Sequence, residues 1–270
     1  MNQHYQTYLE PVIIIAKQAG AAIMQVYATD FDITKKEDHS PLTQADLAAH
    51  HTIVTALQLL TPQIPILSEE SESIADDERL SWQQYWLIDP LDGTREFVKR
   101  NGEFTVNIAL IVNHRPVLGV VYAPVPQLLY YAVQGQGAYK QIAYENALPI
   151  HTKPFVLTQL VVAGSRSHSD HHFQQFLNHL HVATGVTPEL ISMGSSLKIC
   201  LVAEGLADVY PRLGPTSEWD TAAAHCVLNE AGGDIVDAHN KTLQYNTKLS
   251  LLNPNFFATQ VNTLNWAEYL

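Results

Sequence analysis

Two carboxylates stand three positions apart where an apolar run ends, in residues 86–94 (WLIDPLDGT). The run predicts a buried strand that brings Asp89 and Asp92 to the edge of a sheet. Pro90 fixes its own φ angle, and Gly93 can adopt backbone angles that other residues resist, so the turn has a specific shape. Two carboxylates held together are unfavourable unless a cation lies between them, and hard oxygen ligands suit Mg²⁺.

Acidic residues also stand at the ends of two other predicted elements. Upstream, a second short apolar run ends in Glu69 and Glu70. Downstream, Asp220 lies in the first turn of a helix predicted over residues 221–231, which Gly232 and the glycine after it end. Acids at the ends of three elements are what a two-metal phosphoryl-transfer site needs.

Each of these acids also has a simpler interpretation. Paired glutamates are often a solvated loop, and Asp92 followed by Gly93 is a common hairpin turn. Asp220 and Asp46 could each be a first-turn acid that responds only to the helix dipole. All of these interpretations holding at once, in this order along one chain, is improbable.

Two stretches resemble the signatures of the lithium-sensitive inositol monophosphatase superfamily. Residues 89–94 resemble its D-P-[LI]-D-G-T signature, residues 219–223 resemble W-D-x-A-A, and Glu69 matches its upstream glutamate. The resemblance extends from about Gln18 to Asn255. It implies an α/β layered fold, a five-layer αβαβα sandwich, with metal ions at the junction of its two halves.

The resemblance also implies roles for single residues. Two or three Mg²⁺ ions per site would bind Glu69, Asp89, the backbone carbonyl of Leu91, Asp92 and Asp220. Asp46, in a T-x-A-D segment, would accept the hydroxyl proton of Thr94, so that the Thr94 oxygen can accept a proton from the attacking water. The N–H groups that follow Asp92 would hold the phosphate at a helix start. Substrate contacts are expected from Glu69, Leu91, Asp92, Gly93, Thr94 and Asp220.

The second half of the chain carries candidates for a second phosphate site. They are Ser165, Arg166 and His168 after a predicted strand, Gly194, Ser195 and Lys198 at a predicted helix start, and Arg212. A helix N-terminus with hydroxyls and a lysine favours phosphate. A capped helix with a lysine is also ordinary structure, and His168 could be a surface residue. The pattern indicates a substrate with two phosphates.

These segments resemble the bacterial 3'(2'),5'-bisphosphate nucleotidases of the same superfamily. The implied reaction removes the 3'-phosphate of adenosine 3',5'-bisphosphate, a by-product of sulfate assimilation, and gives AMP; the 5'-phosphosulfate analogue is a further candidate substrate. One alternative is a phosphatase of the superfamily that acts on inositol or fructose phosphates. A remoter alternative is a non-catalytic nucleotide sensor.

Composition limits the class of protein. The 270 residues include 15 basic and 27 acidic side chains, a net charge of −12, which argues against a nucleic-acid-binding surface. Cys200 and Cys226 lie in apolar helical contexts and indicate no disulfide framework, so a reducing cytoplasm fits. We expect no signal peptide and no membrane-spanning segment. Peripheral contact with the inner face of the cell membrane and the oligomeric state stay open.

The predicted elements form a single domain of two coupled lobes. The metal-binding lobe covers about residues 1–150 and the substrate-binding lobe about residues 151–270. Helices are predicted at residues 5–27, 43–60, 169–180 and 221–231 and from Ser195, and a polar loop at 34–40. Strands are predicted at residues 64–68, 85–89, 104–112, 117–122, 128–133, 160–164 and 189–193.

Overall fold

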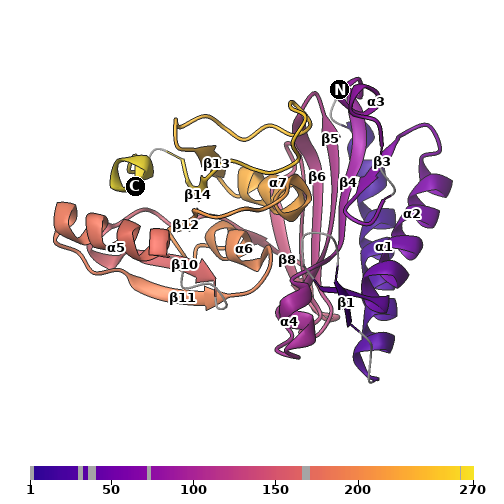
Figure 1. Cartoon of the computed structure of the whole chain (residues 1–270), viewed down its shortest axis with the longest axis horizontal. Coiled ribbons are helices and arrows are strands. Elements are labelled where there is room, and N and C mark those ends of the chain that lie inside the picture. Colours follow the sequence, from indigo (N-terminus) through magenta and orange to yellow (C-terminus); the bar gives the residue numbers. More distant parts are fainter. Residues whose placement is uncertain (1–2, 30–32, 36–40, 72–73, 166–170, 262) are drawn as a thin grey trace.

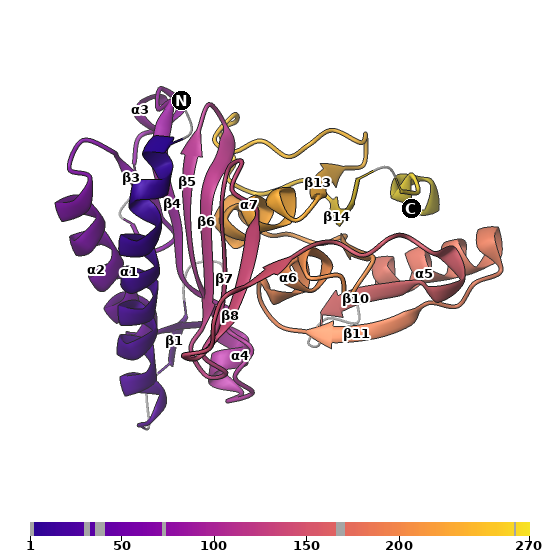
Figure 2. The same ribbon diagram turned by 180° about the vertical axis from the view of Figure 1, so that it is seen from behind.

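Five layers alternate as helix, sheet, helix, sheet, helix, as Figures 1 and 2 show from opposite sides. The structure, a computed structural model, describes residues 3–29, 33–35, 41–71, 74–165, 171–261 and 263–270. The layered α/β sandwich confirms the predicted fold class. The α-helices are α1 (Gln3–Tyr27), α2 (Gln44–Leu60), α3 (Asp76–Leu80), α4 (Thr94–Val98), α5 (His171–Thr184), α6 (Leu197–Ala203) and α7 (Ala222–Glu230). Short 3-10 helices are η1 (Leu157–Gln159), η2 (Glu218–Asp220) and η3 (Trp266–Tyr269).

The first sheet has seven strands whose spatial order follows the chain. Strands β3 and β4 are parallel, and every later pair is antiparallel. The strands predicted from apolar runs in this half are all present, whereas β8 and β9 were not predicted. The strands are β3 (Ile66–Ser68), β4 (Gln84–Asp92), β5 (Thr105–Val112), β6 (Arg115–Ala123), β7 (Leu128–Val133), β8 (Ala138–Ile142) and β9 (Leu148–Ile150).

The second sheet has five strands in the order β11-β10-β12-β14-β13. Its first three strands are parallel, and β14 runs antiparallel to both of its neighbours. Strands β10 and β11 match the prediction, but β12, β13 and β14 were missed. The strands are β10 (Val161–Ser165), β11 (Glu189–Met193), β12 (Val209–Arg212), β13 (Gly233–Asp237) and β14 (Phe256–Gln260).

Three hydrophobic cores fill the spaces between the layers. On β4, Trp86 and Ile88 face the core beneath α1 and α2, while Tyr85 and Leu87 face the core shared with α6 and α7. A sheet buried on both faces therefore explains why β4 reads as a continuous apolar run. The third core lies between the second sheet and α5, around Phe176. The first sheet is formed by residues 66–150 and the second sheet by residues 161–260. This separation along the chain agrees with the predicted division into two lobes, which stays a prediction.

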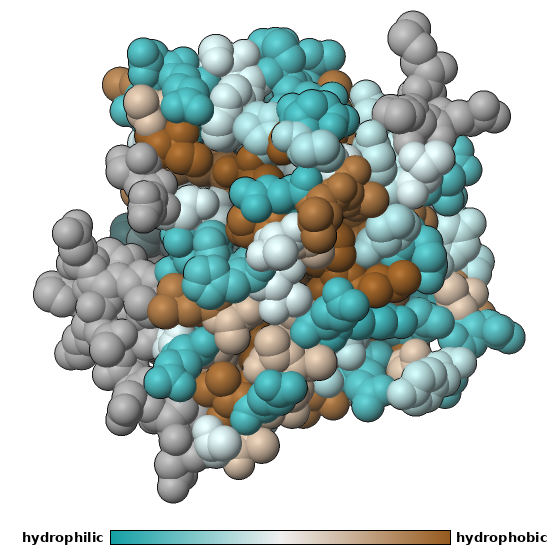
Figure 3. All heavy atoms as spheres, turned by 90° about the vertical axis from the view of Figure 1, so that its right-hand side faces the viewer, coloured by the Kyte–Doolittle hydropathy of each residue, from teal (hydrophilic) through white to brown (hydrophobic). Residues whose placement is uncertain are grey.

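Helix α1 has the length and hydropathy of a membrane span over Tyr5–Tyr27. Its apolar face is nevertheless part of the core, since its own residues Val12, Ile15 and Ile23 are buried there. The outward side of the α1–α2 layer mixes hydrophilic and hydrophobic residues (Figure 3). The helix therefore has the pattern of an amphipathic core helix.

The N-terminal connection differs in part from the prediction. Strand β1 (Ile33–Lys35) pairs with β2 (Pro41–Thr43). The loop predicted over residues 34–40 is therefore wrong at its start, because Thr34 and Lys35 belong to β1; residues 36–40 lie outside the described chain. Helix α2 begins one residue after its predicted cap, Thr43, whose side chain accepts the N–H of Ala45.

Candidate metal centre and phosphate site

A bulge in β4 turns Asp89 and Asp92 toward the same place. In a regular strand, residues three apart point to opposite faces. Here Asp89 is opposite Asn107 of β5 and Asp92 is opposite Thr105, so β4 contains one extra residue. Pro90, inside this irregular stretch, offers no N–H to the ladder. Gly93 then adopts φ 91°, in the left-handed region, as the N-cap residue immediately before α4.

Three carboxylates meet beside this bulge. Asp89, Asp92 and Asp220 each place one oxygen within 4.8 Å of the others. Burial, followed by the charges of Glu69, Asp92 and Asp220, raises the pKa of Asp89 well above its usual range. Burial also raises the pKa of Asp92, and burial with the charges of Asp92 and Glu69 raises the pKa of Asp220 to about 8. Carboxylates that oppose each other's ionisation in this way fit a site for a divalent cation.

Glu69 joins this group from the neighbouring strand. The Glu69 N–H donates to the carbonyl of Ile88 (3.2 Å), which extends the β3–β4 pairing by one residue. Its side chain is within hydrogen-bonding contact of the Asp89 carboxyl. The solvated-loop interpretation therefore does not hold for Glu69. Beside it, His50 Nδ1 lies 2.9 Å from the Ser68 hydroxyl, and burial lowers the pKa of His50.

Two residues that the sequence analysis did not assign hold the side chain of Asp92. The N–H and hydroxyl of Ser196 lie 2.6 and 2.7 Å from Asp92 Oδ2. The amide of Asn107 is 3.4 Å from the same oxygen and donates to the Ser196 hydroxyl (2.8 Å). A signal existed for Asn107, because this polar amide interrupts the apolar residues 106–112 of β5.

The structure brings the predicted pair Asp46 and Thr94 together. The Thr94 hydroxyl lies 3.4 Å from Asp46 Oδ1 and 3.4 Å from the carbonyl of Leu91. The other Asp46 oxygen accepts the N–H and hydroxyl of Thr43 at 2.8 and 2.7 Å. Asp46 is thus a capping residue of α2 that also contacts Thr94, and its role in activating water stays a prediction.

Asp220 lies in the 3-10 helix η2 rather than in the first turn of α7, which corrects the prediction. Its Oδ2 accepts the N–H of Ser217 (2.8 Å), and its backbone carbonyl accepts the Ser196 hydroxyl (2.6 Å). The α-helix begins only at Ala222. The side chain of Asp220 is therefore fixed by its own tight turn, and its backbone carbonyl is held by Ser196, just before α6.

The predicted helix start at Gly194 is built differently from expectation. Helix α6 begins at Leu197, and the N–H groups of Gly194 and Ser196 donate to the carboxylates of Glu103 (2.8 Å) and Asp92 (2.6 Å). These two donors are consequently not available to a phosphate. A Cβ on Gly194 would lie 2.5 Å from the carbonyl oxygen of Glu103, so this close approach requires glycine.

A cavity of ≈ 890 Å³ extends from the acid cluster over the second-lobe candidates. It is lined by Glu69, Asp92, Gly93, Thr94, Ser165, Gly194, Ser195, Lys198, Arg212 and Asp220, together with aromatic residues that include Phe173 and Tyr210. Most of the predicted substrate contacts thus surround one space. Arg166 and His168 lie outside the described residues.

The cations of this cavity have distinct partners. Lys198 Nζ donates to the carbonyl of Ser195 (2.7 Å) and lies 5.3 Å from the centre of the Tyr210 ring. Burial lowers the pKa of Lys198 to about 8, although the charge of Asp92 opposes this. Arg212 donates to the carbonyl of Pro215 (2.7 Å). Within the described chain, Arg212 Nε and Ser195 Oγ are buried polar atoms with no hydrogen-bond partner, which marks both as candidate ligand contacts.

Comparison with known proteins agrees with this geometry. The sequence profile of the inositol monophosphatase family matches residues 4–268. The chain belongs to the inositol monophosphatase family. The two family signatures contain Asp89, Asp92 and Asp220, which lie close together at the bulge of β4 and in η2.

Individual family members are similar over almost the whole chain. The 3'(2'),5'-bisphosphate nucleotidase CysQ of Salmonella typhimurium is 51% identical over 261 residues, which cover 93% of this chain and 99% of that protein. The same enzyme of Aggregatibacter actinomycetemcomitans is 42% identical over 260 residues, 96% and 94% of the two chains. The crystal structure of CysQ from Bacteroides thetaiotaomicron superposes with a TM-score of 0.85 at 41% identity, and covers 97% of this chain and 100% of that chain.

Proposed function

We propose that the chain is a Mg²⁺-dependent 3'(2'),5'-bisphosphate nucleotidase that converts adenosine 3',5'-bisphosphate into AMP and phosphate. The observation that carries this proposal is the cluster of Asp89, Asp92 and Asp220 within 4.8 Å, beside the Thr94–Asp46 contact of 3.4 Å. A binding protein without catalysis would need the acids but not this second pair. The names of the CysQ relatives support the choice of nucleotide.

The residues of the cluster fit a divalent cation because their donor atoms are carboxylate oxygens. Burial and mutual repulsion oppose the ionisation of these carboxylates, and a bound cation would offset both effects. Glu69, Asp89, Asp92 and Asp220, with the carbonyl of Leu91, would hold the ions. When bound, Mg²⁺ neutralises phosphate oxygens and lowers the pKa of water.

The chain's own contribution to the reaction is the orientation of the attacking water. Asp46, held by two donors from Thr43, keeps one oxygen directed at the Thr94 hydroxyl. By accepting that proton, Asp46 would leave the Thr94 oxygen free to accept a proton from water. Gly93, with its left-handed backbone, would let N–H groups at the start of α4 face the phosphate.

For the second phosphate, Arg212 and Ser195 are the better-supported contacts. Among the residues that the structure describes, each has a buried polar atom without a hydrogen-bond partner, and both residues line the cavity that reaches Asp92 and Asp220. Lys198 would add positive charge while holding the Ser195 carbonyl. A place in sulfate metabolism follows from this substrate, and a cytoplasmic location fits the two free, buried cysteines.

A panel of phosphate esters tests the proposal. With Mg²⁺ present, kcat/KM should be highest for adenosine 3',5'-bisphosphate and lower for inositol 1-phosphate and fructose 1,6-bisphosphate. A preference for inositol 1-phosphate would favour the alternative of an inositol phosphatase. Binding of the nucleotide without phosphate release would favour the sensor.

A further inference from the structure

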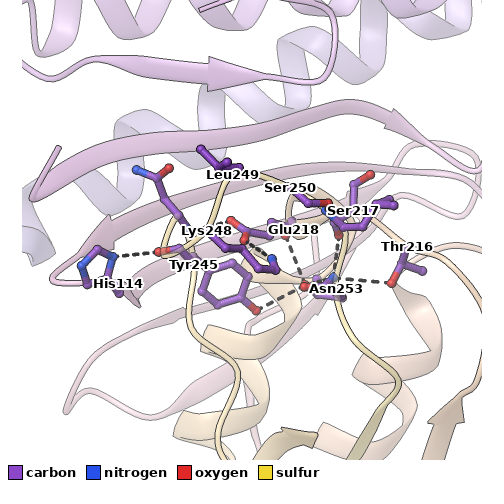
Figure 4. Close-up of polar contacts among 12 residues, drawn as sticks. His114, Thr216, Ser217, Glu218, Tyr245, Lys248, Leu249, Ser250 and Asn253 are labelled. Atoms are coloured by element: carbon purple, nitrogen blue, oxygen red, sulfur yellow. Dashed lines mark hydrogen bonds and ion pairs between the residues drawn. The ribbon is translucent and has the colours of Figure 1, made fainter. Parts of the chain in front are cut away.

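The segment 245–253, between β13 and β14, connects the turn that carries Asp220 with the first sheet. Figure 4 shows labelled residues of this segment between His114 and the turn at Ser217 and Glu218. Asp89 and Asp92 belong to β4 of the first sheet, whereas Asp220 belongs to η2. A metal site shared by these acids requires the two elements to keep a fixed separation.

Glu218 binds this segment two residues before Asp220. Its side chain is fully buried, and its carboxylate accepts the Asn246 N–H (2.6 Å) and the Lys248 ammonium (2.9 Å). The Glu218 N–H donates to the carbonyl of Leu251 (2.8 Å). A buried carboxylate is costly unless it is paired and hydrogen-bonded, as Glu218 is here.

Asn253 binds the other end of the same turn. Its side-chain amide donates to the carbonyl of Ser217 (2.8 Å), and its N–H donates to the carbonyl of Thr216 (2.8 Å). Ser217 in turn donates its N–H to Asp220 Oδ2 (2.8 Å). A chain of hydrogen bonds thus extends from segment 245–253 to the side chain of Asp220.

The first-sheet side anchors the segment at two places. Buried Arg79, at the end of α3, donates to the side chain of Asn246 (2.6 Å) and to the carbonyl of Leu249 (2.8 Å). His114, in the β5–β6 turn, accepts the Tyr245 N–H at its carbonyl (3.1 Å), and its Nδ1 lies 2.9 Å from the Tyr245 carbonyl.

We propose that Glu218 and Asn253 are positioning residues for Asp220, and that through segment 245–253 they set the metal affinity of the acid cluster. This inference rests on the proposed metal site. Groups that orient a metal ligand typically change affinity by about 10- to 100-fold when they are removed. Glu218 and Asn253 act on the turn and not on the metal or substrate, so their effect reaches the site through Asp220.

The test is the dissociation constant for Mn²⁺, measured without substrate by counting free Mn²⁺ with electron paramagnetic resonance. Glu218→Gln and, separately, Asn253→Ala should each weaken binding by roughly tenfold or more. Circular dichroism at the same temperature shows that each variant is folded, and a melting curve reports any loss of stability separately from the binding constant.

Asp208→Asn is the matched control. Asp208 is also a buried carboxylate that accepts one backbone N–H, from Val161 (2.7 Å), and one lysine, Lys153 (2.9 Å), but it lies immediately before β12 of the second sheet. Asp208→Asn should lower the melting temperature and leave the dissociation constant for Mn²⁺ within about twofold of wild type, because the partners of Asp208 do not touch η2.

Three results separate the possible failures. If wild type binds Mn²⁺ and the dissociation constants of Glu218→Gln and Asn253→Ala are the same as that of wild type, the positioning role alone is overturned. Equal weakening in Asp208→Asn would also overturn it, because general loss of stability would then explain the effect. A wild-type chain that binds no Mn²⁺ would overturn this inference together with the proposed metal site.

Discussion

At the scale of single residues, the position of the Asp92 side chain depends on contacts that the sequence motif does not contain. The spacing of two acids around Pro90 predicted that they converge, and they do. The reason is an extra residue in β4, together with support from Asn107 and Ser196 on other elements. Such support depends on contacts between residues far apart in the chain, so the motif alone did not reveal it.

The Asp46–Thr94 contact predicts a specific kinetic effect. Thr94→Ala should lower kcat far more than it raises KM, because it disturbs the attacking water rather than substrate docking. Asp46→Asn should act alike, and the double variant should be little worse than either single one. The measurement is steady-state kinetics of all three variants, and independent, additive losses would argue against a shared role.

Asp46→Asn should differ from Thr94→Ala in stability. Asp46 closes the capping box of α2 with Thr43, so its replacement should lower the free energy of unfolding by about 0.5–2 kcal/mol. Thr94→Ala leaves that cap intact and should lower the free energy of unfolding by less. Urea denaturation of the two variants checks this difference, and equal losses would mean that the cap is not the distinguishing interaction.

Arg212 predicts how the enzyme distinguishes one phosphate from two. Arg212→Ala should reduce kcat/KM for adenosine 3',5'-bisphosphate by about ten- to a hundredfold, since a charge-assisted contact contributes roughly 1.5–3 kcal/mol. Adenosine 3'-phosphate lacks the second phosphate and should lose much less. Exposed Arg115, at the start of β6, provides a control, and Arg115→Ala should change neither value. Equal losses on both nucleotides would assign Arg212 to the reacting phosphate or to the fold.

At the scale of elements, the sequence predicted α1 and α2 from long apolar helical patterns, and β3 to β7 of the first sheet from apolar runs. The strands β12, β13 and β14 were not predicted, and β12 illustrates the physical reason. Strand β12 has four residues, one of them Pro211, and its pairing with β14 joins residues nearly fifty positions apart. The start of α6 was misjudged because its N–H groups satisfy the carboxylates of Glu103 and Asp92.

The junction of α7 and β13 predicts an acid-sensitive contribution to stability. His225 Nε2 lies 2.8 Å from Asp234 Oδ1. Burial raises the pKa of Asp234, but the hydrogen bond and charge of His225, together with hydrogen bonds from the Thr242 hydroxyl and the Ile235 N–H, lower it overall. A depressed carboxyl pKa contributes stability that is present above the unfolded value, about 3.9, and is lost as pH falls through the folded value.

Asp234→Asn should therefore lower the free energy of unfolding at pH 7 by about 1–3 kcal/mol. Its stability should also fall less steeply than that of wild type between about pH 5 and pH 2, because the titrating group is gone. Urea titrations at a series of pH values measure both effects. Parallel pH profiles for variant and wild type would show that this contact does not carry the effect.

At the scale of the whole molecule, the acid cluster lies between layers, with Asp89 and Asp92 from the first sheet and Asp220 from the turn before α7. A bound cation would join these layers, so it should stabilise the entire fold. At a Mg²⁺ concentration one hundred times the dissociation constant, the gain would be about 2.7 kcal/mol. For a chain of this size, we expect a melting-temperature increase of roughly 5–10 °C, reversed by chelator.

Asp220→Asn should reduce this response to Mg²⁺. In chelator its melting temperature should equal or exceed that of wild type, because one of three clustered, mutually repelling carboxylates is gone. Added Mg²⁺ should then raise it little. Differential scanning calorimetry with and without Mg²⁺ measures both values, and a wild-type-sized increase in the variant would remove Asp220 from the proposed ligands.

We propose that the acid cluster holds the metal ions that hydrolysis of the 3'-phosphate requires. The most direct measurement is phosphate release from adenosine 3',5'-bisphosphate by wild type and Asp89→Asn, with Mg²⁺ and with excess chelator. We predict one phosphate per nucleotide and AMP as the product for wild type with Mg²⁺, and no turnover in chelator or in Asp89→Asn. Substantial release by folded Asp89→Asn, or by wild type in chelator, would contradict the account.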